Sequence, residues 1–131
     1  MIFIDSNIPI YLVGAAHANK ERCVSILERL ARDETPLVTD AEVLQEILHL
    51  YAAIDRMDAV QPAFDAILGI VDDVFSVSAD DLIRAKSLLL STSGLSTRDA
   101  VHAAVMTSHE VNTILSFDTG FDVLSFVRRL S

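Results

Sequence analysis

The stretch GLSTRDAVHAAVMTSHEVNTILSFDTGFD, residues 94–122, contains one helix pattern and one strand pattern, each with an acid at a defined place. Ser96 can cap a helix whose first turn contains Asp99 and whose following residues are mostly apolar. Residues 113–117 form a short β-branched and apolar run, which is typical of a buried strand, and Asp118 follows it directly. The helix dipole alone favours an acid at position 99. An acid just past the end of a parallel strand, in contrast, commonly lines a ligand crevice.

The same arrangement recurs at the N-terminus. Residues 1–4, MIFI, have the pattern of a strand that ends in Asp5. Ser6 is expected to cap a helix over residues 7–13, with a proline tolerated in its opening turn. Two separate strands are therefore expected to present a carboxylate at their carboxyl ends.

Helix and strand patterns alternate along the rest of the chain. This alternation predicts an α/β fold, a three-layer α/β/α sandwich with a mainly parallel central sheet, because right-handed crossovers place helices on both faces. The predicted helices cover residues 19–32, the segment after a capping box at Thr39–Glu42, residues 55–71 with a kink or break at Pro62, and the segment opened by residues 78–81; the predicted strands cover residues 36–38, 74–77 and 123–127.

Size and composition favour one domain over residues 1–131, large enough for a full hydrophobic core. Hydrophobic residues make up 51% of the chain and mean hydropathy is +0.40, so some apolar surface is expected to be covered by a partner or by a second copy in a homodimer. Residues 1–5 lack the pattern of a signal peptide and no membrane-length apolar run occurs, so neither secretion nor membrane insertion is expected, and the single Cys23 lies in a helix pattern. A reduced, cytoplasmic location is therefore expected.

The chain is strongly acidic, with a net charge of −9 and a pI near 4.6. Nucleic-acid binding normally requires a basic patch, so this charge argues against a general nucleic-acid coat. Acidic residues that bind divalent cations would contribute to the negative net charge of the sequence, although the bound cations would neutralise them.

Four acids are candidates for such a site: Asp5, Asp99, Asp118 and Glu46, which lies beside the core stripe of the third predicted helix. Taken alone, Glu46 would be expected to keep its carboxylate in water. Together, the four would repel one another unless a cation compensated them. Ligation by oxygen alone favours Mg²⁺ or Mn²⁺, and the matching chemistry is hydrolysis of a phosphodiester by water that the metal activates.

These residues resemble a known family, the PIN-domain ribonucleases, and among them the VapC-like toxins of toxin–antitoxin pairs. The resemblance spans nearly the whole chain. It rests on the motifs DSN at 5–7, EVLQEIL around Glu46, LSTRDAVHAA at 95–104, SFDTGFD at 116–122 and the following VRRL.

The resemblance implies an α/β/α sandwich, a Mg²⁺- or Mn²⁺-dependent endoribonuclease that acts on RNA, and inhibition by a small cognate antitoxin. Asp5, Glu46, Asp99 and Asp118 match the family's acidic quartet, with Asp5, Asp99 and Asp118 as the expected metal ligands. Ser116 and Asp122 match accessory positions of the family, and Asn7 belongs to the first motif.

Several residues have a second interpretation. His102 is one turn from Asp99 and could share its metal, but its alanine-rich surroundings favour a role in helix packing. Arg98 could contact a substrate phosphate or simply be solvated. Glu46 and His49 match half of a di-iron motif, which needs a second copy that the chain lacks.

Two other classes of protein would also fit parts of the pattern. A receiver-like signalling domain places acids at strand ends around Mg²⁺, but here Asp5 begins no acidic pair and the last strands contain no lysine. The other is a non-catalytic binding domain. Metal-dependent RNA cleavage that EDTA abolishes distinguishes a nuclease from both.

Overall fold

The computed structural model describes residues 1–131 and contains one sheet of five parallel strands in the order β3-β2-β1-β4-β5. The strands are short, as their sequence patterns indicated: β1 (Ile2–Ile4), β2 (Leu37–Asp40), β3 (Asp73–Phe75), β4 (Thr113–Leu115) and β5 (Arg128–Leu130). The chain begins at the centre of the sheet, extends to one edge through β2 and β3, and then returns to form the other half.

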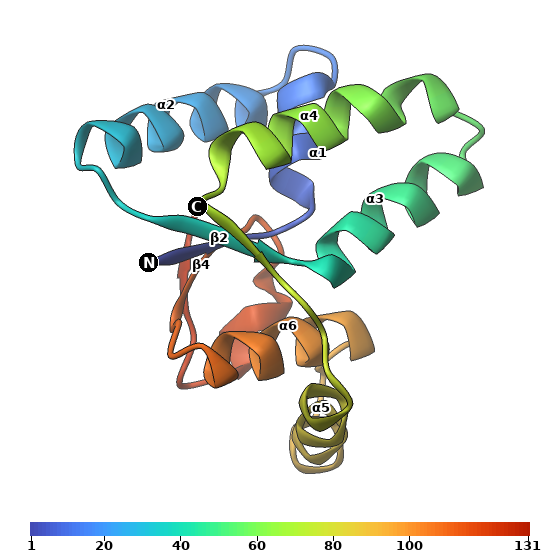
Figure 1. Cartoon of the computed structure of the whole chain (residues 1–131), viewed down its shortest axis with the longest axis vertical. Helices are drawn as coiled ribbons and strands as arrows, with labels where there is room; N and C mark the ends of the chain where they lie inside the picture. The colour runs from blue at the N-terminus through green and yellow to red at the C-terminus, as the bar shows by residue number, and fades with distance from the viewer.

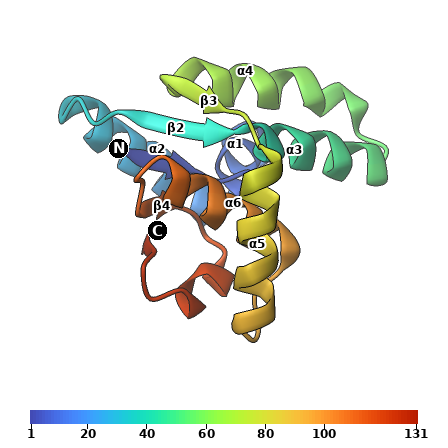
Figure 2. The same ribbon diagram turned by 60° about the horizontal axis from the view of Figure 1, so that its bottom comes forward.

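Helices cover both faces of this sheet. They are α1 (Asn7–Val13), α2 (Ala18–Arg32), α3 (Ala41–Ala53), α4 (Val60–Ile70), α5 (Ala79–Ser91) and α6 (Thr97–Ser108), with two 3₁₀ segments, η1 (Met57–Ala59) and η2 (Thr119–Val123). Helices α1 to α4 lie on one face, and α5 and α6 on the other (Figure 1, Figure 2). The predicted three-layer sandwich with a parallel sheet is confirmed.

The central strands are buried from both sides, which explains their continuous apolar sequences. Phe3 and Ile4 of β1 and Ile114 and Leu115 of β4 are fully buried in the main core. On the second face, α6 packs against α5 through small residues, chiefly Ala85, Ala100, Val101 and Ala104. None of the helices combines the length and the apolar composition needed to cross a bilayer.

This strand order places a crevice at the carboxyl ends of β1 and β4. The chain leaves β1 toward β2, whereas β4 pairs with the opposite edge of β1, and ligands of open α/β sheets bind at such a reversal. The register pairs Ile4 with Leu115, and the Asp5 N–H donates to the Leu115 carbonyl at 3.1 Å. Because α6 leads into β4, its N-terminus lies at the same end of the sheet.

The prediction of a last strand over residues 123–127 is wrong. Phe121 and Leu124 are buried three residues apart, while Val123 and Phe126 are exposed, so the apolar side chains follow a 3₁₀ period rather than the alternation of a strand. The last strand is β5, which starts at Arg128.

Helix starts were predicted with mixed success. Ser78 and Ser96 cap α5 and α6 as expected, and Ser78 forms a full capping box with Asp81. Ser6 makes no side-chain cap, and the residue that caps α3 is Asp40 rather than Thr39. Pro62 lies in the first turn of α4, where its missing N–H costs no hydrogen bond, so the predicted break is instead the 3₁₀ turn η1 before the helix.

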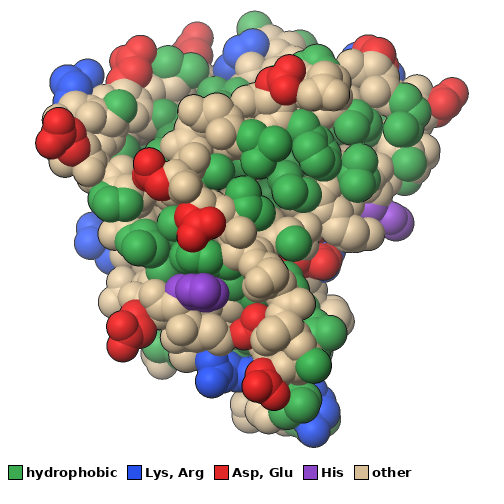
Figure 3. Space-filling view, in the orientation of Figure 1, with side chains coloured by type: hydrophobic (Ala, Val, Ile, Leu, Met, Phe, Trp, Pro, Cys, Tyr) green, Lys and Arg blue, Asp and Glu red, His purple; other side chains and the backbone are tan.

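Exposed hydrophobic side chains gather on the face that carries α3 and α4 (Figure 3). Leu48, Ile54, Met57 and Leu68, all on α3, η1, α4 or the loop between them, are each between 44% and 58% exposed. The expectation that a partner or second copy covers apolar surface stays a prediction.

Candidate active site

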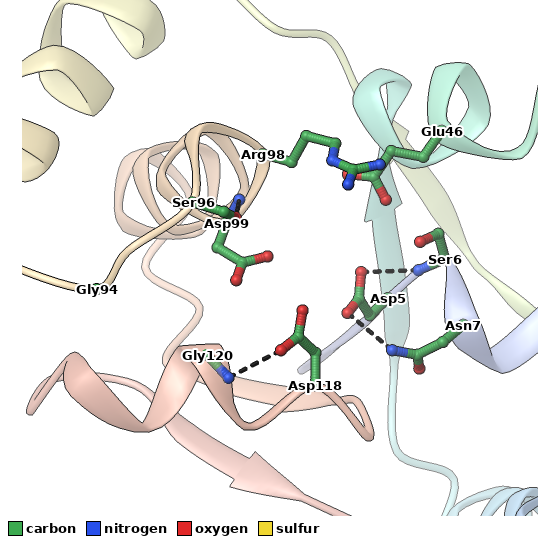
Figure 4. A pocket seen from close by; sticks show the side chains of 10 residues that line it. All are labelled: Asp5, Ser6, Asn7, Glu46, Gly94, Ser96, Arg98, Asp99, Asp118 and Gly120. Atoms are coloured by element: carbon green, nitrogen blue, oxygen red, sulfur yellow. Dashed lines mark hydrogen bonds between the residues drawn. The ribbon is translucent and has the colours of Figure 1, made fainter. Parts of the chain in front are cut away.

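A polar pocket of about 320 Å³ opens at the carboxyl end of the sheet. None of its lining residues is hydrophobic, and they come from segments far apart in the sequence (Figure 4). The lining residues are Asp5, Ser6, Asn7, Glu46, Gly94, Ser96, Arg98, Asp99, Asp118 and Gly120. The structure therefore brings all four predicted acids to one pocket.

Asp5 is the most rigidly held of these acids. It follows β1, is 4% exposed, and accepts hydrogen bonds from the Ser116 hydroxyl at 2.6 Å, the Ser6 N–H at 2.8 Å and the Asn7 amide at 3.3 Å. Burial raises the pKa of Asp5, and the nearby His102 and the Ser116 hydrogen bond only partly oppose this rise. The three donors fix the position of the Asp5 carboxylate but do not offset the effect of burial on its pKa.

Ser116 connects the ends of the two central strands. Its fully buried hydroxyl donates to Asp5 and accepts from the Asn7 amide at 3.2 Å and from the Asp118 N–H at 3.0 Å. Asn7 in turn accepts from the Phe117 N–H at 3.4 Å. Ser116 and Asn7 therefore orient the acids around them.

Asp99 and Asp118 lie on either side of Gly120. The Gly120 N–H donates to Asp118 Oδ1 at 2.8 Å, and a Cβ at position 120 would lie 2.8 Å from Asp99 Oδ2 and 3.0 Å from Asp118 Oδ1. Burial, together with the negative charges of Asp118 and Asp5, raises the pKa of Asp99 to about 6. Glycine is needed here because any side chain would displace a carboxylate.

Glu46 reaches the pocket from α3 and is 7% exposed, so the expectation that it would keep its carboxylate in water is wrong. Its Oε1 lies 2.7 Å from His102 Nε2. Burial raises the pKa of Glu46, but the hydrogen bond and charge of His102 outweigh burial and lower the pKa below its ordinary value. A specific partner makes this burial tolerable.

Sequence reasoning favoured helix packing for His102 and placed Asp40 only within a capping box, so the contacts of these two residues with the site were not predicted. His102 is fully buried beside the rings of Phe3 and Phe121, and its Nδ1 lies 2.8 Å from Asp40 Oδ2. Burial alone lowers the pKa of His102, but hydrogen bonds to Asp40 and Glu46 outweigh it and raise the pKa well above its ordinary value. Packing explains only part of its role. The available signals were the spacing of His102 from Asp99 and the helix-capping position of Asp40.

A divalent cation fits the carboxylates better than it fits the histidine. Asp5, Glu46 and His102 each offer one atom within 4.8 Å of the others. Both ring nitrogens of His102 already lie at hydrogen-bonding distance from carboxylates, 2.8 Å from Asp40 and 2.7 Å from Glu46, so neither is free for a metal. The remaining donors are carboxylate oxygens, the set that Mg²⁺ or Mn²⁺ prefers.

Two predicted accessory residues occupy different environments. Arg98 is exposed and is the only basic residue that lines the pocket. Asp122 is outside the lining and pairs with Arg129 at 2.8 and 3.1 Å, while Arg129 also donates to the Ser116 carbonyl at 3.2 Å. Asp122 therefore supports the loop after β4 from outside.

Cys23 is also remote from the chemistry. It is buried in the main core, and burial raises the pKa of its thiol to about 11. A thiol of this kind stays protonated near neutral pH and is a poor nucleophile.

Comparisons with known proteins agree with this arrangement. The PIN domain family model matches residues 2–127. Ribonuclease VapC13 of Mycobacterium tuberculosis is 50% identical over 131 residues, which is the full length of both chains, and a VapC ribonuclease of Mycobacterium bovis matches to the same extent. The crystal structure of Mycobacterium tuberculosis VapC20, described as a sarcin-ricin loop cleaving toxin, superposes with a TM-score of 0.78 at 27% identity and covers 97% of each chain. With its fold, its acid-lined pocket and a family match over nearly its whole length, this chain belongs to the PIN domain family.

Proposed function

We propose that this chain is a divalent-metal-dependent endoribonuclease that hydrolyses RNA phosphodiester bonds and acts as the toxin of a toxin–antitoxin pair. One observation carries the proposal: Asp5, Glu46, Asp99 and Asp118, from four separate segments, converge on a pocket that has a single basic residue in its lining. The full-length similarity to proteins named VapC ribonucleases supports it.

Asp5, Asp99 and Asp118 are the residues proposed to hold Mg²⁺ or Mn²⁺. When bound in such a site, the metal lowers the pKa of water and stabilises the charge on the leaving oxygen. Asp5 is oriented before any ligand arrives, because three donors fix it. Asp99, with a pKa of about 6, is ionised and ready to bind a cation at neutral pH.

The remaining lining residues are suited to substrate. Glu46 stays ionised because its pKa is lowered, so it can accept a hydrogen bond from the attacking water. Arg98 at the rim can donate to a phosphate oxygen of the substrate. Since the lining includes no hydrophobic side chain, the pocket suits the sugar-phosphate backbone rather than a stacked base.

The test is cleavage of end-labelled single-stranded RNA by the purified chain with Mg²⁺ or Mn²⁺ and with EDTA. We expect metal-dependent cleavage that Asp5→Asn abolishes, because the change removes a charged ligand and nearly preserves volume. Asp65→Asn is the matched control, since Asp65 is exposed on α4 and bonded only to Gln61. A folded Asp5→Asn protein with wild-type turnover would remove the basis of the proposal.

The resemblance to VapC toxins also implies a partner, a small antitoxin protein, and action in the cytoplasm, where RNA is made. The exposed apolar side chains on α3, η1 and α4 offer surface for a partner or a second copy. Co-expression with the product of an adjacent small reading frame should give a stable complex without RNA cleavage. Undiminished cleavage by a co-purified complex would contradict the toxin–antitoxin part of the proposal.

A further inference from the structure

We infer that His102, anchored by Asp40, is a positioning residue that fixes Glu46 for the proposed cleavage reaction. This inference rests on the proposed function. His102 is not among the residues that line the pocket, so any effect it has on the reaction passes through a neighbour.

Three buried side chains form the connection. Asp40 Oδ2 lies 2.8 Å from His102 Nδ1, and His102 Nε2 lies 2.7 Å from Glu46 Oε1. Asp40 and His102 are fully buried, and Glu46 is 7% exposed. The Nε2 atom is 3.8 Å from Asp5 Oδ1, beyond hydrogen-bonding distance, so the contact with Glu46 dominates.

Asp40 gives the connection a rigid base. It ends β2, and its Oδ1 caps α3 by accepting the Val43 N–H at 2.9 Å. One carboxylate therefore uses one oxygen to start the helix that carries Glu46 and the other to hold the ring that orients Glu46. His102 itself comes from α6, on the opposite face of the sheet, so the connection also joins the two helical layers.

Glu46 needs such support because a glutamate side chain has several freely rotating bonds. Fixing a side chain of this length costs conformational entropy. The rings of Phe3 and Phe121 flank the imidazole, with centroids 5.3 and 6.5 Å away, and leave it little freedom. The fixed ring therefore holds one Glu46 oxygen, while the carboxylate remains at the pocket wall.

A double-mutant cycle in turnover tests this role. We expect His102→Gln to lower kcat by about 10- to 100-fold, the range typical of partners that orient a site residue. In a Glu46→Gln background the same change should lower kcat much less, since the residue through which His102 acts is already impaired. Additive losses would overturn the inference.

Two further measurements distinguish positioning from a purely structural or metal-binding role. The affinity for Mn²⁺, measured by calorimetry, should fall much less than kcat, because Asp5, Asp99 and Asp118 keep their places. A parallel loss of Mn²⁺ affinity would assign His102 to the metal site instead. Ser108→Ala is the stability control, because Ser108 lies on the same helix and bonds to Asp81 away from the pocket.

Variants of Asp40 keep the inference testable if His102→Gln does not fold. Asp40→Ser preserves a helix-capping oxygen but removes the contact with Nδ1, whereas Asp40→Asn preserves the cap and keeps a hydrogen-bonding group at Nδ1, to which its amide donates in the tautomer that carries the hydrogen on Nε2. Asp40→Ser should therefore lose more kcat than Asp40→Asn, and equal losses would contradict the inference. If the wild type cleaves no RNA with metal, the proposed function fails; if it cleaves and the cycle is additive, only the positioning role fails.

Discussion

Replacing Asp99 by Asn should stabilise the metal-free protein at neutral pH. Asp99 is 7% exposed, and burial together with the charges of Asp118 and Asp5 raises its pKa from 3.8 to about 6. A pKa difference of one corresponds to about 1.4 kcal/mol, so the ionised carboxylate destabilises the fold by up to about 3 kcal/mol. An acid in the first turn of α6 also interacts favourably with the helix dipole, by about 0.3–1 kcal/mol, and Asn loses that interaction.

The expected net gain is therefore up to about 2–2.7 kcal/mol, which corresponds to up to roughly 10 °C in Tm for a chain of this size. Its pH dependence follows from the direction in which the pKa moves on folding. A raised folded-state pKa favours the folded protein below the unfolded value of 3.8, and this advantage is lost as pH rises through about 6. The stability difference between Asp99→Asn and wild type should thus be largest above about pH 7 and should shrink as pH falls toward about 4.

Thermal melts in EDTA across this pH range, followed by a Mn²⁺ series at about pH 7.5, measure both effects. A cation that binds only the folded state adds about 2.7 kcal/mol at roughly 100 times its Kd, so wild type should gain Tm with Mn²⁺ and Asp99→Asn should gain much less. Asp65→Asn, on exposed α4 surface, should behave as wild type. An unchanged or lower Tm for Asp99→Asn in EDTA at that pH, or an equal Mn²⁺ response, would refute the reasoning.

Three other predictions follow from the site. Gly120→Ala places a Cβ 2.8 Å from Asp99 Oδ2 and 3.0 Å from Asp118 Oδ1. The Asp99 and Asp118 side chains can rotate away from it, so Tm should change little. Their carboxylates would then be misplaced by about 1 Å, and steady-state assays should show a roughly 100-fold loss of kcat. Asp122→Asn should keep most activity in the same assay, since Asp122 pairs with Arg129 outside the pocket. RNA products should carry 5′-phosphate and 3′-hydroxyl ends, because water attacks the phosphorus; end-labelling that revealed a 2′,3′-cyclic phosphate would exclude this mechanism.

Local patterns predicted the fold and the acid quartet because each depends on a few neighbouring residues. Short apolar runs that end in Asp5 and near Asp118 marked β1 and β4, and the alternation of helices and strands then placed these ends side by side. Ser96 and Ser78 marked helix starts through the same local chemistry. The last strand was mispredicted because residues 123–127 are uniformly apolar or small, and only burial shows which spacing applies.

The connection from Asp40 through His102 to Glu46 could not be predicted from local sequence patterns. His102 lies 62 residues from Asp40 and 56 from Glu46, and its contacts exist only once α6 packs across the sheet from α3. In sequence, a histidine among alanines is typical of a packing residue, and Asp40 is typical of a helix cap. Both side chains do fill those roles, and the additional hydrogen bonds arise from tertiary structure.

The charges of the pocket acids are balanced only in part by basic side chains. The pocket gathers Asp5, Glu46, Asp99 and Asp118 in a chain that already carries a net charge of −9, and Arg98 is the only basic side chain in its lining. His102, whose pKa is raised, supplies a buried positive charge, but the carboxylates of Asp40 and Glu46 beside it neutralise that charge. Burial is the main cause of the raised pKa values of Asp5 and Asp99, and the negative charges of Asp118 and Asp5 add to the rise for Asp99. In an acidic protein with this distribution of charge, divalent cations bound by these carboxylates would offset part of the negative charge that faces an RNA phosphate.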